Sequence, residues 1–411
     1  MKIKDVKCAI IADTPVIRID SDEGISGFAQ LDGVEYRSEY VKQQTQFYRK
    51  FVLDLDPTRP QHVMAKINRF VGFKPWGSVA SAIEIALWDL FGKYAGLPVH
   101  KLLGGKLRDK VRVYSTRTGA PYPHLNLMPE DYYEVAVKRK NHPFGFKIFK
   151  FRVGFHGAEG KPALNSIPES YYGDSLGVAH PARGHLTEIG LRYLVQCVEA
   201  LRNALGEDLG LALDCGPGFS VASAVKFSRA IEKFNILWLE DLITGDFYPY
   251  TAVEAYRLLR IKSNIPIHTG EQINSRYGFK ELIEKEAVDV VGPDPADCGG
   301  LSEIKWIAEF AELHQIMIAP HSGFNGPIGL MASVHVSSTM PANFIAMEFP
   351  FASNSAWWDN TLVKGLPQPL VENGYVNVPE KPGLGIELDE NTARKYTREG
   401  DEDFFETDAP K

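Results

Sequence analysis

The alternation of hydrophobic and polar residues changes rhythm at about residue 111. From there, short apolar runs alternate with longer amphipathic segments of helical period. Eight such runs are VRVYS at 111–115, FKIFKF at 146–151, LGLALD at 209–214, ILWLE at 236–240, IPIHTGE at 265–271, VDVVGPD at 288–294, IMIAPH at 316–321 and FIAME at 344–348. Eight strand–helix alternations predict an α/β fold of the (β/α)₈ barrel type.

The segments that flank this region have a different pattern. Alternating apolar residues around a turn at 20–24 predict two strands, and residues 38–70 have a polar helical pattern. Residues 78–95 predict a denser helix that stops at Gly96, whereas residues 368–390 have the pattern of turns and short strands. The expected parts are an α+β capping region at 1–110, the barrel at 111–352 and a C-terminal segment at 353–411 that packs on the capping region.

The rival fold is an open doubly wound sheet. That fold would place a glycine-rich phosphate-binding turn after its first strand, and the chain has no GxGxxG or Walker motif. Hydrophobic residues make up 44% and charged residues 24% of the 411 positions. These ordinary globular values exclude a disordered, collagenous or coiled-coil protein.

The net charge limits the classes of binding partner, and the cysteines indicate the cellular compartment. Lys and Arg total 45 against 52 Asp and Glu, a net charge of −7, which argues against nucleic acid or an anionic membrane as the main partner. No apolar run approaches the roughly 20 residues of a membrane span, and the N-terminus lacks a secretory apolar core. The four cysteines are scattered, so we expect a cytoplasmic protein with reduced thiols.

Ionisable side chains stand at the ends of nearly all the predicted barrel strands. They are Lys150 and Arg152, then Asp214, Glu240, Glu271, Asp294, His321 and Glu348. The active site of such a barrel lies where the strands end, and ionisable groups are rarely buried without partners. This regularity predicts an enzyme.

Three of these residues form a candidate metal site. Asp214, Glu240 and Glu271 end three consecutive predicted strands, so their carboxylates converge. They would repel one another unless a cation neutralises them, and hard oxygen ligands suit Mg²⁺. The alternative is that each is a salt-bridge partner at the barrel rim.

Two cations share one strand face, because Lys150 and Arg152 are separated by one residue. Beside a metal they can bind a substrate carboxylate, and the neighbouring arginine lowers the pKa of Lys150, which makes that lysine a candidate base. The alternative for both is an ion pair to the metal carboxylates.

His321 and Asp294 lie one strand–helix unit apart, so they should be neighbours. A carboxylate on one imidazole nitrogen fixes the tautomer and raises the basicity of the other, which predicts a catalytic dyad. Several roles stay open for Glu348. It contacts the metal, the substrate or His321, or it has a purely structural role.

These motifs together resemble the enolase superfamily, in its mandelate racemase / muconate lactonizing enzyme branch. The resemblance rests on SAIEIALWDLFGKYAGLPVHKLLGG at 81–105, WLED at 238–241, GEQ at 270–272, PDPADCGGLSE at 293–303 and PHSG at 320–323. It implies a capping α+β domain made from both termini and a modified (β/α)₇β barrel. It also implies that Asp214, Glu240 and Glu271 bind Mg²⁺, and that Asp294 and His321 form the dyad of the mandelate racemase subgroup.

The chain departs from that pattern in three places. The subgroup's racemases carry Lys-x-Lys on the second barrel strand, where this chain has Lys150-Phe151-Arg152, and arginine is a poor proton acceptor. An insertion at about 154–185 is rich in Gly, Pro and Ser, and the loop after the first strand is short. The residues of the insertion that could reach the site are Tyr171, Tyr172, His180 and His185.

The resemblance implies removal of a proton next to a carboxylate. We expect a Mg²⁺-dependent dehydratase that converts an aldonic or aldaric acid to a 2-keto-3-deoxy acid. The alternative is a racemase, epimerase or cycloisomerase that uses Lys150 and His321 on opposite faces, and the third reading is a binding protein on a retired enzyme scaffold. The expected partner is a small-molecule carboxylate, and the resemblance favours a symmetric homo-oligomer.

Overall fold

The computed structural model describes residues 1–31, 38–70, 78–116, 128–154, 186, 188–216, 218–243, 252–322, 326–349 and 362–406. Over these ranges no helix combines the length and the apolar character that a membrane span requires. All four cysteines lie in the described ranges and are free. The structure contains a single chain, so the expected homo-oligomer stays a prediction.

Eight parallel strands form a curled sheet, as the apolar runs predict. They are β4 (Lys110–Ser115), β5 (Ile148–Arg152), β6 (Gly210–Asp214), β7 (Ile236–Glu240), β8 (Ile267–Thr269), β9 (Val290–Val291), β10 (Met317–Ile318) and β11 (Met347–Phe349). Strand β11 pairs in parallel with β4, and Phe344, just before β11, bridges to Ile318 of β10. These contacts join the two ends of the sheet and close the ring.

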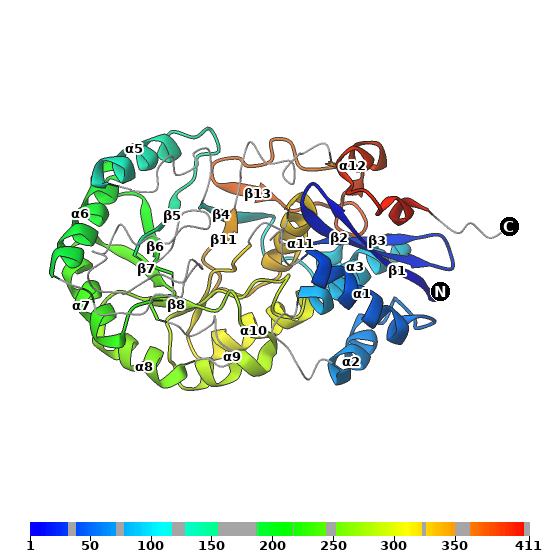
Figure 1. Ribbon diagram of the computed structural model, residues 1–411, viewed down its shortest axis with the longest axis horizontal. Helices are drawn as coiled ribbons and strands as arrows, with labels where there is room; N and C mark the ends of the chain where they lie inside the picture. Colours follow the sequence, from blue (N-terminus) through cyan, green and yellow to red (C-terminus); the bar gives the residue numbers. More distant parts are fainter. Residues whose placement is uncertain are drawn as a thin grey trace.

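Within the described ranges, seven helices connect the eight strands, which gives the (β/α)₇β order. They are α5 (Pro129–Lys140), α6 (Glu188–Leu205), α7 (Val221–Ile231, followed by the 3₁₀ turn Glu232–Phe234), α8 (Val253–Lys262), α9 (Ser275–Glu284), α10 (Leu301–Leu313) and α11 (Gly326–Ser338). Figure 1 shows α5 to α10 as an arc outside the strands. Helix α11 is buried along its whole length, which its apolar composition permits.

Strands β8 to β11 are shorter than their apolar runs, and this changes where the polar residues lie. Strand β8 ends at Thr269 because the chain bends at Gly270, whose φ is 132°. Glu271 therefore lies in the loop beyond β8, and Asp294 and His321 lie beyond β9 and β10 in the same way. Asp214 and Glu240 are the last residues of their strands, as predicted.

The first part of the chain forms a three-stranded antiparallel sheet with helices. Its elements are β1 (Ile3–Ile11), β2 (Thr14–Ser21), β3 (Ser26–Gln30), α1 (Ser38–Val52), α2 (Pro60–Phe70), α3 (Ser78–Ala95) and the short α4 (Val99–Leu102). Strands β1 and β2 are joined by Ala12 and Asp13, whose φ angles of 51° and 66° are typical of the tight hairpin turn that matches strand twist. The loop after the first strand is thus as short as predicted.

The C-terminal segment contacts both the first sheet and the barrel. Its elements are β12 (Val363–Lys364), β13 (Tyr375–Asn377), β14 (Glu387–Leu388), α12 (Glu390–Tyr396) and a 3₁₀ turn at Glu402–Phe405. Thr397 bridges to Ile11 at the end of β1, so the segment packs on the opening region as expected. Strand β13 in addition pairs antiparallel with β4 of the barrel. Figure 1 shows α12 and the N-terminus on the side of the first sheet.

Candidate active site

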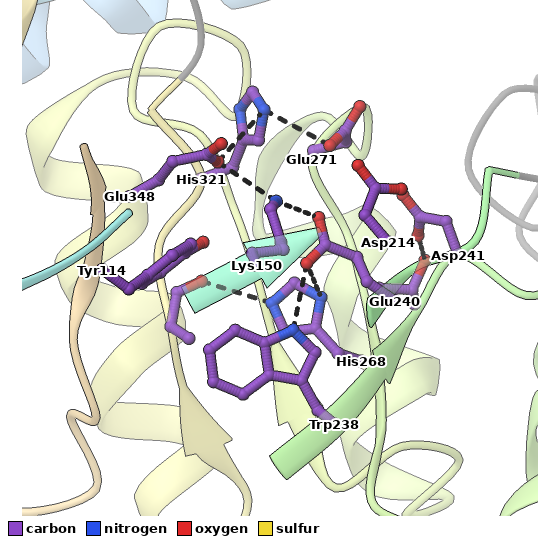
Figure 2. A network of polar contacts seen from close by, with 12 residues as sticks. Tyr114, Lys150, Asp214, Trp238, Glu240, Asp241, His268, Glu271, His321 and Glu348 are labelled. Atoms are coloured by element: carbon purple, nitrogen blue, oxygen red, sulfur yellow. Dashed lines mark hydrogen bonds and ion pairs between the residues drawn. The ribbon is translucent and has the colours of Figure 1, made fainter. Parts of the chain in front are cut away.

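Lys150 lies at the centre of a buried polar network at the carboxyl ends of the barrel strands (Figure 2). Its Nζ is 2.5 Å from Oε1 of Glu240 and 3.3 Å from Oε2 of Glu348. Burial acts to lower the pKa of Lys150, but these two carboxylates raise it well above its usual value. The ion pair that the sequence left as an alternative for Lys150 is therefore present, and the amine carries a proton in this network.

His321 and Asp294 are neighbours, as their spacing predicts. Nδ1 of His321 lies 2.7 Å from Oδ2 of Asp294, which fixes the ring so that Nε2 faces the site. That nitrogen is 3.3 Å from Oε2 of Glu271 and 3.4 Å from Oε2 of Glu348. Burial acts to lower the pKa of His321, but the three carboxylates raise it well above its usual value.

Glu348 joins the two halves of the network. Its Oε2 lies between Nζ of Lys150 and Nε2 of His321 (Figure 2). Burial acts to raise the pKa of Glu348, but Lys150 and His321 together lower it. Of the roles that the sequence left open, the structure supports contact with His321.

A cluster of carboxylates faces these cations. One oxygen each from Glu240, Asp241 and Glu271 lies within 4.8 Å of the others. Asp214 stands beside Glu240 because the two are paired in register on β6 and β7 (Figure 2). Burial raises the pKa of Glu240 to about 8, against the attraction of Lys150, and Asp214 adds to the increase. The ionised carboxylates are thus costly without a further positive charge.

This donor set fits a hard divalent cation. Carboxyl groups outnumber the cations in the described network. The cations are Lys150 and His321, and the carboxyl groups are those of Asp214, Glu240, Asp241, Glu271, Asp294 and Glu348. Hard oxygen ligands are those that Mg²⁺, Ca²⁺ and Mn²⁺ prefer. The assignment of Asp214, Glu240 and Glu271 as ligands stays a prediction, with Asp241 as a fourth carboxylate within reach.

Arg152 is the last residue of β5 and is half-buried, in register with Asp214 on β6. Its backbone carbonyl accepts a hydrogen bond from the hydroxyl of Tyr132, 3.0 Å away. Its predicted role at a substrate carboxylate stays a prediction. The insertion, with Tyr171, Tyr172, His180 and His185, lies outside the described residues apart from its first position.

Sequence reasoning missed four side chains around Glu240 and Lys150. They are Tyr114, Trp238, Asp241 and His268 (Figure 2). The period of two along β7 puts Trp238 on the face of Glu240, and His268 is paired in register with Glu240 on β8. Asp241 follows Glu240 directly, and its φ of 49° turns the chain sharply after the strand. Periodicity in the sequence therefore signals Trp238 and His268, whereas it gives no sign of the turn at Asp241.

The comparisons with known proteins agree with this architecture. Residues 8–104 match the model of the mandelate racemase / muconate lactonizing enzyme N-terminal domain, and residues 134–392 match the enolase C-terminal domain-like model. A solved structure of a member of the enolase superfamily from Salmonella Typhimurium superposes with a TM-score of 0.81 at 27% identity. The match covers 97% of this chain and 98% of that one.

Two relatives carry names that describe an activity. The chain is 30% identical over 329 residues to the D-xylonate dehydratase of Haloferax volcanii, which covers 80% of this chain and 72% of that protein. It is 26% identical over 393 residues to the D-galactarolactone cycloisomerase of Agrobacterium fabrum, with 93% of this chain and 90% of that protein covered.

Proposed function

The chain belongs to the enolase superfamily, in its mandelate racemase / muconate lactonizing enzyme branch, and from this premise we propose that it is a Mg²⁺-dependent acid-sugar dehydratase. The substrate is an aldonic or aldaric acid, and the product is a 2-keto-3-deoxy acid. The observation that carries the proposal is the convergence of the His321–Asp294 dyad and Lys150 on one carboxylate, that of Glu348, beside the acidic cluster. The name of the Haloferax volcanii relative points to the same class of substrate.

The reaction begins at the carbon next to the substrate carboxylate. The C–H bond there breaks, and its electron pair enters the carboxylate as an enediolate. The C–O bond at the next carbon then breaks, its hydroxyl leaves as water after it gains a proton, and the enol that remains becomes the 2-keto acid. When bound at Asp214, Glu240 and Glu271, Mg²⁺ supplies positive charge that stabilises the enediolate.

His321 accepts and then donates the proton in this scheme. Asp294 holds its Nδ1, so Nε2 is the nitrogen that accepts the proton from carbon. His321, like Lys150, must be neutral before it can accept a proton. Its raised pKa then makes the neutral ring a stronger base and keeps the proton taken from carbon on the ring until the hydroxyl leaves. One dyad thus acts as base and then as acid, and the chain needs no second base at Arg152.

The two cations of β5, Lys150 and Arg152, bind the substrate carboxylate and do not abstract its α-proton. The high pKa of Lys150 keeps its amine protonated, which suits attraction of a carboxylate and not proton abstraction. Arg152 offers a planar fork of N–H donors to a carboxylate. Glu348 holds Lys150 and His321 at fixed separation through the contacts of its Oε2.

The second candidate function is that of an epimerase or cycloisomerase. It is favoured by the two proton-carrying groups on either side of Glu348, because Lys150 and His321 each contact the same oxygen from different strands. The Agrobacterium fabrum relative is named a cycloisomerase. In this scheme the two groups act on opposite faces of one carbon, and Lys150 must first lose its proton.

The test is a screen of the purified full chain with Mg²⁺ against a library of aldonic and aldaric acids in D₂O. A carbonyl-trapping reagent reports keto products, and proton NMR reports the α-proton. We expect a 2-keto-3-deoxy acid from at least one acid sugar, with no product when a chelator removes the metal. Exchange of the α-proton without a keto product would contradict dehydration and favour the epimerase. Product formation at full rate with the metal removed would contradict the role of Mg²⁺.

A further inference from the structure

Aromatic rings fill the barrel directly beneath Glu240 and Lys150. Tyr114, Trp238 and His268 are each at most 1% exposed, and the alanines at 212, 319 and 346 leave room for them. Trp238 stacks on His268 with ring centroids 5.4 Å apart and 20° between the planes. In Figure 2 these two rings lie under the carboxylate of Glu240. We call Trp238 and His268 the ring pair.

The ring pair contacts one oxygen of Glu240 only. The indole Nε1–H of Trp238 donates to Oε2 over 3.1 Å, and Nδ1 of His268 is 3.4 Å from the same oxygen. The other oxygen, Oε1, faces Nζ of Lys150 at 2.5 Å. The two oxygens of this buried carboxylate therefore point to opposite environments, one to the rings and the other to the Lys150 network.

The space for His268 is built into neighbouring strands. A Cβ atom at Gly292 would lie 2.2 Å from Cε1 and 2.4 Å from Nε2 of the imidazole. The φ of Gly292 is outside the left-handed region, so the ring, rather than the backbone conformation, requires glycine there. Nε2 of His268 lies 3.3 Å from the carbonyl oxygen of Ala319, which anchors the far edge of the ring. The imidazole is thus held on both edges.

We infer that Trp238 and His268 are positioning residues that orient Glu240, so that Oε1 is the oxygen available to the divalent cation and to Lys150. The inference rests on the proposed function, in which Glu240 is a metal ligand. Neither ring touches the cation or the substrate in this assignment. Loss of the indole donor leaves Oε2 without its hydrogen bond and allows the carboxylate to rotate. Groups that orient metal ligands typically change metal affinity about 10–100-fold when they are replaced.

The experiment measures Mg²⁺ affinity alone, by calorimetric titration of the full chain at one pH. Trp238→Phe keeps an aromatic ring and removes the indole donor. The matched control is Trp88→Phe on α3, because Trp88 Nε1 also donates to a buried glutamate, Glu84, over 2.7 Å. We expect Trp238→Phe to weaken Mg²⁺ binding about 10–100-fold. Trp88→Phe should leave Mg²⁺ binding unchanged, because the Trp88 indole donates to Glu84 and not to a proposed metal ligand.

The possible outcomes separate the inference from the function on which it rests. Wild-type affinity in a folded Trp238→Phe variant would overturn the inference and leave the proposed function standing. Failure of the wild-type chain to bind Mg²⁺ would overturn both. If Trp238→Phe does not fold, His268→Asn tests the same oxygen, since it removes the second contact to Oε2; there, weaker Mg²⁺ binding supports the inference and unchanged binding overturns it.

Discussion

Glu84 on α3 accepts a hydrogen bond from the backbone N–H of Leu301, the first residue of α10, with Oε2 and N 2.7 Å apart. Its other oxygen accepts from the backbone N–H of Ser302 over 3.0 Å. The first N–H groups of a helix have no partner within the helix, and a carboxylate there satisfies them. A Cβ atom at Gly300 would lie 2.2 Å from Oε2, so glycine permits this approach. The contact ties the first part of the chain to the helix that follows the Asp294 loop.

The variant Glu84→Gln tests this contact through its pH dependence. Burial raises the pKa of Glu84 to about 7, against hydrogen bonds from Ser302 and Trp88 that lower it, whereas the unfolded chain titrates near 4.5. The folded state therefore holds the proton more tightly. This contribution to stability is complete below pH 4.5 and is lost as the pH rises through about 7, and it amounts to about 3 kcal/mol. We expect wild type to lose this amount relative to Glu84→Gln between those pH values.

Urea unfolding of both proteins across this pH range measures the difference. The control is Glu309→Gln, whose side chain is 52% exposed on the same helix α10 and should leave the pH dependence of wild type intact. Parallel pH profiles for wild type and Glu84→Gln would show that Glu84 does not titrate in this range.

The variant His321→Asn tests the dyad. Asparagine can keep a hydrogen bond to Asp294 but cannot take up a proton, so we expect dehydration to fall about 10²–10⁴-fold, the usual contribution of general acid–base catalysis. Mg²⁺ affinity should change little. The rate of keto-acid formation at saturating substrate measures the effect, with Mg²⁺ titration as the control for an intact site. Retained turnover would remove His321 from the reaction.

Either Asp214 or Asp241 completes the proposed metal site with Glu240 and Glu271, and variants of the two residues distinguish these ligand sets. Asp241 Oδ1 accepts the hydroxyl of Thr269 over 2.6 Å, whereas Asp214 Oδ1 accepts the N–H of Gly216 over the longer distance of 3.3 Å. We therefore expect Asp214→Asn to weaken Mg²⁺ binding more than Asp241→Asn, by at least about tenfold. Calorimetric titration of both variants decides the order. A larger loss in Asp241→Asn would replace Asp214 by Asp241 in the ligand set.

Periodicity along the sequence predicts the elements of this fold well, because it depends on which residues face the core. The helix expected at 78–95 is α3, and each of the eight expected apolar runs overlaps a barrel strand. The order of the strands around the ring places Asp214 and Glu240 side by side, and the repeat of one strand and one helix places Asp294 beside His321. Convergence of the site therefore follows from spacing.

The surroundings of each site residue do not follow from spacing in the same way. Periodicity puts Trp238 on the side of Glu240, but it does not show that the rings of Trp238 and His268 stack on each other beside that carboxylate. Asp241 enters the cluster through a left-handed φ at a non-glycine residue, which sequence patterns rarely signal. The pKa values of Lys150 and His321 depend on distances to Glu348 that only the folded chain defines.

Arg152→Lys tests whether the second cation of β5 binds substrate or determines the type of reaction. Arg152 ends the strand two residues after Lys150 and is half-buried beside Asp214 in register. A lysine keeps the positive charge but loses the planar fork that binds a carboxylate through two hydrogen bonds. We expect the KM for the acid sugar to rise about tenfold, the cost of one charge-assisted hydrogen bond, while kcat falls less than about threefold.

Steady-state kinetics in D₂O, with NMR of the products, separate these roles. The control is Lys147→Arg, since Lys147 is exposed directly before the same strand and its replacement should leave both kinetic constants unchanged. Unlike arginine, a lysine at 152 can exchange a proton with the substrate carbon. If Arg152→Lys yields a deuterated epimer and KM stays the same, Arg152 prevents reprotonation of the enediolate rather than anchoring the carboxylate. A rise in KM without epimer instead supports the anchor, because the chemical step then proceeds through the His321–Asp294 dyad as in wild type.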